Sequence, residues 1–333
     1  MNHQLFRALI ERINTNEDAT AHWFQEKFNL SSSQILEVIS HFQGLGLSII
    51  LRDSGKIELL EPYDALNKNE ISKKLSSELE KITHIQEPLL TINSTNEHLK
   101  QNRDELSQAV RICLAEHQSR GRGRCNKYWH SPFAKNIYFS FQHRFMVPIN
   151  EISGISLMVG MSIVEALKRF KINELQIKWP NDIYCRYKKL GGILIEATNI
   201  EVGGVDLIIG IGLNVDMPQI KNNVIDQPWI DLKQITGRRL SRNDLIAAFS
   251  NQIYQNSLIY QKSGLEEFLS RWRELDYLDK KDIVVSFANE KQIQGKAIGI
   301  NTSGELLLQT DNQVTNIHSG DVSVRPINHD TAY

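Results

Sequence analysis

The stretch Lys178-Trp-Pro-Asn-Asp-Ile-Tyr-Cys-Arg-Tyr-Lys-Lys-Leu-Gly-Gly-Ile-Leu-Ile-Glu196 contains the clearest signs of fold class and ligand binding in this chain. A β-rich run over residues 176–179 ends in the turn Pro180-Asn-Asp182, and a second apolar run follows the pair Gly191-Gly192. Glycines and a cation at a strand end are typical of small-ligand sites in mixed α/β proteins. A turn of purely structural use would have the same composition, so this stretch alone leaves both interpretations open.

The surrounding chain alternates β-rich runs with longer helical patterns, which predicts a mixed α/β domain over residues 82–274. The strands are expected at 136–141, 176–179 and 206–209, and the helices at 153–170 and 244–263. After Asp276 the pattern changes to short strands separated by turns, at 282–287, 292–300, 305–309 and 322–325. This pattern predicts a small SH3-like β-barrel over residues 275–330.

The first 64 residues predict a winged helix-turn-helix. Apolar residues follow helical spacing over 5–13 and 19–28, and Ser31 can cap a third helix with Ile35, Val38, Ile39 and Phe42 on one face. Two short strands follow, at 47–51 and 56–60, around the turn Asp53-Ser-Gly55. Residues 65–80 are polar, with charges at helical spacing, and predict a solvated linker helix within 65–81.

Charge does not favour DNA binding by this N-terminal region. Residues 1–60 contain five Lys or Arg and seven Asp or Glu, a net charge of about −2, and the presumed recognition helix over 31–45 has no Lys or Arg. DNA contacts would therefore depend on hydroxyl and amide donors of that helix and on two cations of the wing: Ser31, Ser32, Ser33, Gln34, Arg52 and Lys56. The alternative is a helical domain used for packing or for contacts with another protein.

Composition excludes several classes. With 333 residues, 41% hydrophobic, 23% charged and a net charge of −1, the chain has an ordinary multidomain composition and no overall attraction to nucleic acid or anionic membranes. Its three cysteines lack zinc or disulfide spacing and predict unpaired thiols. The N-terminus does not resemble a signal peptide, and the apolar stretch 155–167 is too short to span a bilayer. We expect a cytoplasmic protein without a membrane contact.

Glycines alternate with arginines in Gln118-Ser-Arg-Gly-Arg-Gly-Arg124, ahead of Trp129 and Ser131-Pro-Phe133. Such a backbone can fold over a ligand while guanidinium groups neutralise an anion, often a phosphate. A disordered basic loop is the alternative. The run Ile209-Gly-Ile-Gly-Leu-Asn214 also puts glycines at a strand end, where backbone can approach a ligand closely, but it lacks the third glycine of a dinucleotide fingerprint.

Together these segments resemble the biotin–protein ligases, and most closely the bifunctional members that also act as biotin repressors. The resemblance covers nearly the whole chain, in the same order of domains. It rests on Asn93-Ser-Thr-Asn96, Ala115-Glu-His-Gln118, Gly121-Arg-Gly-Arg124, Trp129, Ser131-Pro-Phe133, Lys178-Trp-Pro-Asn-Asp182, Lys189-Leu-Gly-Gly-Ile-Leu-Ile-Glu196 and Gly210-Ile-Gly-Leu-Asn214. The loop departs from many relatives at Cys125-Asn-Lys-Tyr128, where further Gly and Arg are usual.

The resemblance implies a two-step reaction. Biotin reacts with ATP to give biotinyl-5′-AMP, and a lysine of a carrier domain then takes the biotin. Biotin would be held by Ser94, Thr95, Asn96, Gln118, Gly121, Arg122, Gly123, Arg124 and Lys178. ATP or the adenylate would be held by Arg122, Arg124, Trp129, Lys189 and Asn214, with Lys178, Arg122 and Arg124 as the catalytic residues.

The same resemblance implies Mg²⁺ that arrives with ATP, with no protein side chain assigned to it. The implied partners are the biotin carboxyl carrier protein of acetyl-CoA carboxylase, operator DNA upstream of biotin-synthesis genes, and a second copy of the chain when biotinyl-AMP is bound. Two other functions stay open on the sequence: a non-catalytic, DNA-binding biotin sensor, and a lipoate or octanoate transferase with a related fold.

Overall fold

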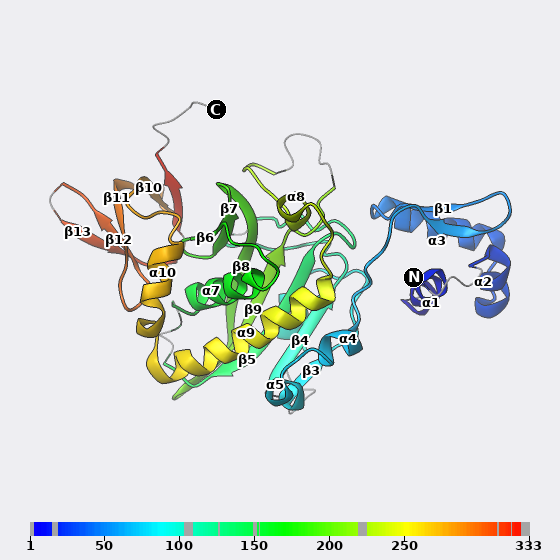
Figure 1. Cartoon of the computed structure of the whole chain (residues 1–333), viewed down its shortest axis with the longest axis horizontal. Coiled ribbons are helices and arrows are strands. Elements are labelled where there is room, and N and C mark those ends of the chain that lie inside the picture. Colours follow the sequence, from blue (N-terminus) through cyan, green and yellow to red (C-terminus); the bar gives the residue numbers. More distant parts are fainter. Residues whose placement is uncertain are drawn as a thin grey trace.

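A computed structural model describes residues 3–14, 19–102, 109–125, 127–148, 152, 154–218, 225–311, 313–320 and 322–327. Three parts follow one another along the chain. The N-terminal helices and the C-terminal strands lie at opposite ends of a large central sheet (Figure 1). The C-terminal strands pack into the same hydrophobic core as the central sheet, whereas the N-terminal helices form a core of their own.

The central sheet has seven strands, and its edge strands are β3 and β6. Their order across the sheet is β3 (Thr83–Ile85), β4 (Val110–Ala115), β5 (Ile137–Phe145), β9 (Gly204–Leu213), β8 (Lys188–Glu201), β7 (Asp182–Cys185) and β6 (Leu175–Lys178). Only β3 and β4 are parallel; the other neighbours are antiparallel. The strands predicted at 136–141, 176–179 and 206–209 are confirmed.

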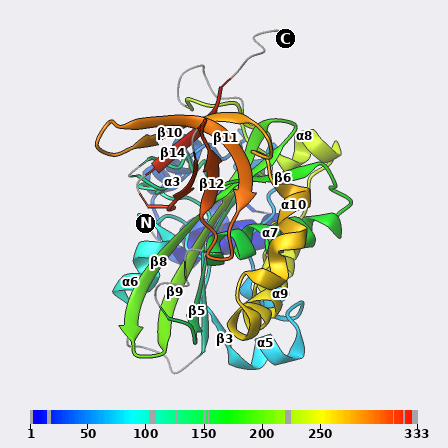
Figure 2. The same cartoon turned by 90° about the vertical axis from the view of Figure 1, so that its left-hand side faces the viewer.

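Helices cover both faces of this sheet. Figure 2 shows α6 (Thr95–Gln101) on one side and α7 (Ile155–Lys168) and α9 (Arg242–Ser263) on the other. Most of α7 is buried because it lies between the sheet and α9, which explains its apolar composition. Among the described residues, no helix is long and apolar enough to cross a membrane. The chain then continues through α8 (Leu232–Thr236), the 3₁₀ turn Glu266–Phe268 and α10 (Leu269–Leu275).

The N-terminal unit has the predicted order of three helices and a hairpin. These elements are α1 (His3–Asn14), α2 (Ala21–Phe28), α3 (Ser32–Gly44), β1 (Ile49–Leu51) and β2 (Ile57–Leu59). Ser31 caps α3 as predicted: its Oγ accepts from the Gln34 backbone N–H, and the Gln34 side chain accepts from the Ser31 N–H. Ile35, Ile39 and Phe42 form the buried face.

The prediction of one solvated linker helix is wrong. Residues 65–82 form two short helices, α4 (Lys68–Ser72) and α5 (Ser77–Ile82), and α5 has Ser76 as its N-cap. Ile71, Leu75 and Leu79 are buried in the central core. These apolar residues recur at every fourth position, so the segment contained a buried helical face that the surrounding charges obscured.

The C-terminal strands form a five-stranded antiparallel sheet in the order β13-β12-β11-β10-β14. The strands are β10 (Asp282–Phe287), β11 (Gln292–Ile300), β12 (Leu306–Gln309), β13 (Val314–Ile317) and β14 (Val322–Pro326). Four of them were predicted. The sequence analysis missed β13, because its sequence Val-Thr-Asn-Ile contains no apolar run. Residues 328–330, the end of the predicted barrel domain, lie outside the described residues.

The C-terminal sheet contacts the central unit at Trp179, inside the stretch that opens the sequence analysis. The buried Trp179 indole donates from Nε1 to the Gly304 carbonyl oxygen at 2.9 Å. Gly304 has φ +76°, and a Cβ there would lie 2.9 Å from the Gly154 Cα. Trp179 therefore has a structural role, since it attaches the C-terminal sheet next to the candidate site.

Candidate active site

A buried cluster of neutral polar groups lies at the N-terminus of α6. The Gln118 Oε1 accepts from the Thr95 backbone N–H at 3.0 Å and from the Thr95 Oγ1 at 3.2 Å. The Ser140 Oγ lies 2.7 Å from the Thr95 Oγ1 and 2.6 Å from the Asn96 Oδ1. Ser94 is the N-cap residue of α6, but its hydroxyl makes no capping hydrogen bond. The four predicted polar residues thus meet in one cluster.

Two serines of this cluster were missed by the sequence analysis. Ser140 lies in the middle of the buried strand β5, and Ser131 accepts from the Gln118 Nε2 at 3.3 Å. The single serine inside the apolar run 137–141 was the available signal for Ser140, because a buried polar group needs a partner. For Ser131, the sequence analysis used the motif Ser-Pro-Phe only as a mark of resemblance.

The glycines of β9 give space to side chains of the protein itself. A Cβ at Gly210 would lie 2.4 Å from the Asn96 Oδ1, and a Cβ at Gly212 would lie 2.5 Å from the Trp129 Cε2. A Cβ at Gly121 would lie 2.5 Å from the Trp129 carbonyl oxygen. The sequence analysis expected a ligand to approach these glycines, whereas the groups that lie against them here are the Asn96 amide, the Trp129 ring and the loop backbone.

Cations gather where β6 ends and β8 begins. The Lys189 Nζ pairs with the Asp182 Oδ1 at 2.9 Å, and the Lys178 Nζ lies 5.5 Å from the centre of the Tyr184 ring. Burial lowers the pKa of Lys178; Asp182 opposes this shift, and Lys189 and other nearby cations add to it. The site therefore has an excess of positive charge, which suits an anionic ligand.

Two of those nearby cations are Arg325 in β14 and Lys127 in the loop, and neither was a candidate in the sequence analysis. Arg325 was missed because it is far from the other site residues in sequence, and only the docking of the C-terminal sheet brings it near Lys178. Lys127 was noted only as part of the departure from relatives. No sequence signal distinguished it from an ordinary loop lysine.

The loop between Gly121 and Trp129 closes as a hairpin and reaches the C-terminal sheet. The Gly123 N–H donates to the Lys127 carbonyl oxygen at 2.7 Å, and the Trp129 N–H donates to the Gly121 carbonyl oxygen at 2.9 Å. The Arg124 guanidinium lies 3.4 Å from the Asn181 Oδ1 and also donates to the carbonyl oxygens of Ser319 and Gly320. Arg124 therefore lies on the side of Lys178, next to the turn Pro180-Asn-Asp182.

Arg122 points elsewhere. Its guanidinium pairs with Glu97 of α6 and Glu196 of β8, on the side of the neutral polar cluster. The two arginines of the motif, which the sequence treated as equivalent, thus have different partners.

Asn214 connects the end of β9 to two other segments. Its Nδ2 donates to the carbonyl oxygens of Lys189 (3.4 Å) and Ile230 (3.1 Å), and the residue is buried. Two residues further on, the Asp216 Oδ2 accepts from the Arg239 Nε at 2.8 Å.

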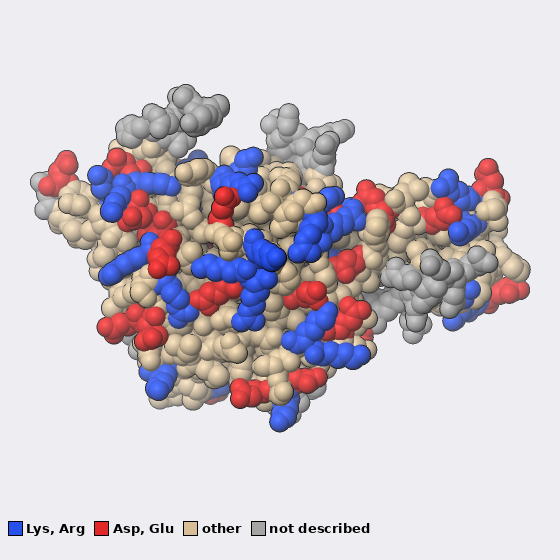
Figure 3. Space-filling model, viewed as in Figure 1, with Lys and Arg blue, Asp and Glu red and all other residues tan. Residues whose placement is uncertain are grey.

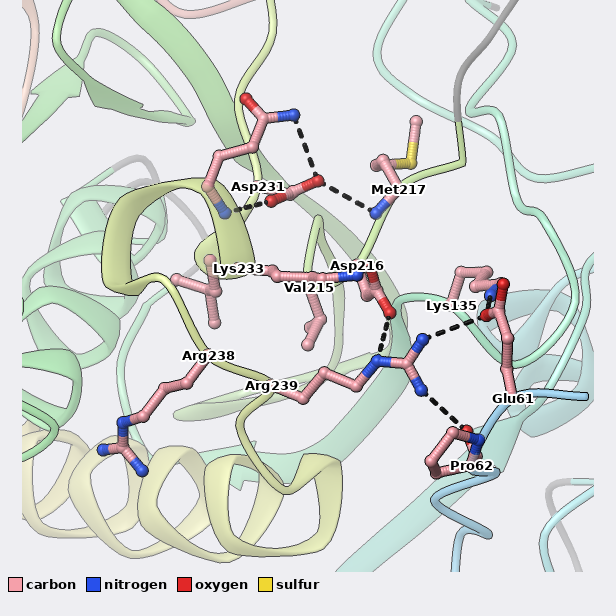
Figure 4. A network of polar contacts seen from close by, with 12 residues as sticks. Glu61, Pro62, Lys135, Val215, Asp216, Met217, Asp231, Lys233, Arg238 and Arg239 are labelled. Atoms are coloured by element: carbon pink, nitrogen blue, oxygen red, sulfur yellow. Dashed lines mark hydrogen bonds and ion pairs between the residues drawn. The ribbon is translucent and has the colours of Figure 1, made fainter.

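Arg239 also contacts the start of the linker. It donates to the Pro62 carbonyl oxygen at 2.8 Å and to the Glu61 Oε2 at 2.9 Å (Figure 4). Glu61 pairs with Lys135 as well, at 2.9 Å. The segment that follows Asn214 and the exit from the N-terminal unit therefore share one polar network.

The N-terminal unit also packs on the segment that follows the loop. The Phe133 ring lies 5.6 Å from the Phe6 ring, 5.8 Å from the Phe42 ring and 6.3 Å from the Tyr63 ring, centre to centre. The Tyr63 hydroxyl also donates to the Glu116 Oε1 at 2.7 Å, and the buried Arg242 pairs with the Glu116 Oε2 at 2.6 Å. The residues between Gly121 and Phe133 thus contact all three parts of the molecule.

The six residues predicted for DNA contact have local partners. The Ser31 and Gln34 side chains make the α3 cap, the Ser33 Oγ lies 2.8 Å from the Ser31 Oγ, and Ser32 accepts from Gln25. Arg52 and Lys56 both pair with Glu58, at 2.9 and 3.2 Å. Figure 3 shows acidic and basic side chains mixed over the visible face of this unit.

Comparison with known proteins identifies the family of this chain. Residues 90–214 match the Biotin/lipoate A/B protein ligase family, and residues 285–325 match the Biotin protein ligase C terminal domain. The bifunctional ligase/repressor BirA of Salmonella typhimurium is 32% identical over 301 residues, which cover 90% of this chain and 91% of that protein. The biotin–[acetyl-CoA-carboxylase] ligase of Mycobacterium tuberculosis is 25% identical, over 63% of this chain and 77% of that protein.

Among solved structures, the biotin protein ligase from Aquifex aeolicus in complex with biotin and ATP superposes with a TM-score of 0.63 and 27% identity. It covers 73% of this chain and 99% of its own. The fold and the converging polar and cationic groups thus define an enzyme of the biotin and lipoate ligase class. Within that class, the chain belongs to the biotin protein ligases. The alternatives of a lipoate transferase and of a non-catalytic sensor are not retained.

Proposed function

We propose that this biotin protein ligase makes biotinyl-5′-AMP and transfers the biotin to the carrier protein of acetyl-CoA carboxylase. The observation that carries the proposal is the position of the loop Gly121–Trp129, between a neutral polar cluster and a cationic cluster. A ureido ring needs paired donors and acceptors, whereas a carboxylate and a triphosphate need cations. The name of the Mycobacterium tuberculosis relative supports the choice of carrier.

In the first step, a biotin carboxylate oxygen attacks the α-phosphorus of ATP, and pyrophosphate leaves. Ser94, Thr95, Asn96 and Gln118 would hold the ureido ring, together with the loop backbone at Gly121 and Gly123. Lys178 would lie between the carboxylate and the α-phosphate, and Arg124 would add a second cation. A fixed donor at charge that develops in the transition state contributes roughly 10²- to 10³-fold in rate. Their charges reduce the repulsion between two anions.

Burial makes the charged form of Lys178, which this role needs, less favourable than it would be in water, and so lowers its pKa. Burial and the neighbouring cations favour the neutral amine, and Asp182 counteracts them. An arriving carboxylate or phosphate would stabilise the ammonium form. In this proposal Asp182 offsets part of the unfavourable burial of the Lys178 ammonium group.

The nucleotide would contact Lys189, Asn214, Trp129 and Arg124. Mg²⁺ would arrive with the ATP phosphates, which supply hard oxygen ligands. In the described part of the chain there is no group of three or more His, Cys, Asp or Glu side chains placed to hold a metal. In this proposal the protein therefore orients the phosphates, and the ion shields their charge when it is bound.

In the second step, the amine of the carrier lysine attacks the carbonyl carbon of the mixed anhydride, and AMP leaves. The proposed contribution of the loop is exclusion of water, since water would hydrolyse the anhydride. Its hairpin hydrogen bonds and the contact of Arg124 with the C-terminal sheet support a closed position.

We also propose that the N-terminal unit is a winged helix-turn-helix that binds operator DNA. It would repress biotin-synthesis genes when biotinyl-AMP favours a homodimer. The order of its elements and the names of the BirA relatives support this. Anisotropy titrations with DNA from upstream of those genes would test it. We expect binding that needs both biotin and ATP, and equal binding without them would contradict the coupling.

The ligase proposal is tested by mixing the protein with biotin, Mg·ATP and an unmodified biotin carrier domain, and measuring the mass of the carrier. We expect the carrier to gain one biotin only when ATP is present. An octanoylated or lipoylated carrier, with the corresponding acid supplied, would contradict the choice of substrate. No mass change with a carrier that another biotin ligase modifies would contradict the proposed acceptor.

A further inference from the structure

Arg122 is held by two carboxylates from separate elements. Its Nη2 lies 3.0 and 3.3 Å from the two carboxylate oxygens of Glu196 in β8, and 3.3 Å from the Glu97 Oε2 in α6. The Glu196 side chain is 19% exposed, compared with 39% for Arg122. The contact thus joins the first arm of the loop hairpin to the sheet and to α6 at once.

Glu196 is shared between the loop and the polar cluster proposed to hold biotin. The Asn96 Nδ2 donates to the Glu196 Oε2 at 2.8 Å, and the Asn96 Oδ1 contacts the Ser140 Oγ at 2.6 Å. Asn96 is buried. Glu196 therefore connects Arg122 directly to side chains at the floor of the site, so that the loop position and the site geometry are coupled by one carboxylate.

The second arginine of the loop, Arg124, does not share the carboxylate partners of Arg122. Arg124 contacts Asn181 and the C-terminal sheet, on the side where Lys178 lies. Arg122 already has two carboxylate partners, which neutralise its charge locally. Its geometry suits a residue that keeps the loop closed better than a residue that binds phosphate.

We propose that Glu97 and Glu196 are positioning residues that form a latch with Arg122 and so set the rate at which biotin leaves the closed site. This rests on the proposed function for the identity of the ligand. Opening the loop breaks both ion pairs, and their loss leaves Glu196 partly buried without its main cationic partner. Lys100 is a second cation near Glu196, with its Nζ 4.0 Å from the Glu196 Oε1, compared with 3.0 Å for the Arg122 Nη2.

The test uses Glu196→Gln and Glu97→Gln, singly and together. A glutamine at 196 keeps an oxygen that can accept from Asn96, so the substitution mainly removes the charge that holds Arg122. Glu201→Gln is the matched control, because Glu201 lies on the same strand and pairs with Arg144 instead. We expect biotin to dissociate about 3- to 10-fold faster from the double variant, and the control to match the unmodified protein.

Steady-state pyrophosphate release, measured with a saturating carrier domain so that the adenylate is consumed in every turnover, separates positioning from chemistry. The latch predicts that the KM for biotin rises by a similar factor while kcat stays within about 2-fold. Trypsin should also cut faster in the loop, after Arg122 or Arg124, in the biotin-bound double variant. In an Arg122→Gln background the two glutamate substitutions should add nothing further, since their common partner is absent.

The result that would overturn the latch is an unchanged biotin dissociation rate in a double variant that keeps the unmodified melting temperature. A fall in kcat without faster dissociation would also overturn it, because it would place Glu196 in the chemistry. Biotin dissociation is measured without the carrier, so it tests the latch independently of the transfer reaction. A protein that binds biotin and shows the latch effect but never modifies a carrier would defeat only the proposed transfer reaction.

Discussion

The central unit and the N-terminal unit use their polar side chains in different ways. In the central unit, the candidate residues come from distant segments and meet in buried clusters, where they hydrogen-bond across elements. In the N-terminal unit, the candidates Ser31–Gln34, Arg52 and Lys56 lie on the surface and mostly contact residues close by in sequence. The difference teaches that a polar residue paired across the fold indicates a site more strongly than one whose partner is local.

The largest effect is expected where the two units join. Glu116→Ala removes the nearer carboxylate partner of the fully buried Arg242, whose other carboxylate, Asp64, is 4.0 Å away, and leaves the Leu66 N–H and the Tyr63 hydroxyl without their acceptor. A buried charge left unpaired costs about 3–5 kcal/mol, so urea denaturation should show a loss of that size. Glu61→Ala, which removes an exposed partner of Arg239, is the control and should cost less than about 1 kcal/mol. Equal losses would show that burial does not distinguish the two contacts.

Lys178→Ala tests whether catalysis belongs to the central unit. Removing its ammonium should lower the rate of pyrophosphate release roughly 10²- to 10³-fold, with little change in melting temperature. Lys168→Ala, in the last turn of α7, is the control and should leave the rate unchanged. A Lys178→Ala protein with normal pyrophosphate release would remove the residue from the proposed chemistry.

Asp276 makes the stability of the central unit depend on pH. Burial raises the pKa of Asp276 to about 6, and its Oδ1 accepts from the Leu278 N–H at 2.8 Å. Its unfolded value is about 3.9, so the neutral acid is favoured on folding; this contribution is complete below about pH 4 and is lost as the pH rises through 6.

Asp276→Asn keeps the acceptor and removes the ionisation. It should raise the free energy of unfolding at pH 7.5 by about 1–3 kcal/mol, with no comparable gain at pH 4.5. Urea denaturation at both pH values measures this, and Asp282→Asn, at an exposed position in β10, is the control. A gain that is the same at both pH values would mean that charge burial is not its cause.

The smallest effect concerns the α3 cap. Ser31→Ala should destabilise the N-terminal unit by about 1 kcal/mol, since it removes the hydroxyl that accepts from the Gln34 backbone N–H, while the Ser31 backbone N–H can still donate to the Gln34 side chain. Ser40→Ala, exposed in the middle of the same helix, should have almost no effect. Hydrogen exchange of α3 amides measures both. If Ser31→Ala abolished DNA binding without weakening α3, Ser31 would be a DNA contact and the contrast between the two units would weaken.

The order of elements could be predicted because apolar periodicity and turn residues act locally. The three N-terminal helices, the Ser31 cap and four of the five C-terminal strands follow from such patterns. The linker prediction failed because charges around Ile71 and Leu79 suggested a solvated helix, whereas burial depends on what lies opposite. The sequence analysis missed β13 because the sequence Val-Thr-Asn-Ile has no apolar run, whereas its pairing with β12 and the burial of Ile317 depend on the rest of the sheet.

The sequence by itself determined which residues could do chemistry: the Gly-Arg loop, the cations Lys178 and Lys189, and the neutral polar residues 94–96 with Gln118. These are fixed by residue type and motif. Only the tertiary structure decided their partners, because hydrogen bonds and ion pairs depend on distances between segments far apart in the chain. It brought Ser140 beneath Asn96 and Arg325 near Lys178. It also directed Arg122 and Arg124, which the sequence motif does not distinguish, to different partners: Glu196 for Arg122 and Asn181 for Arg124.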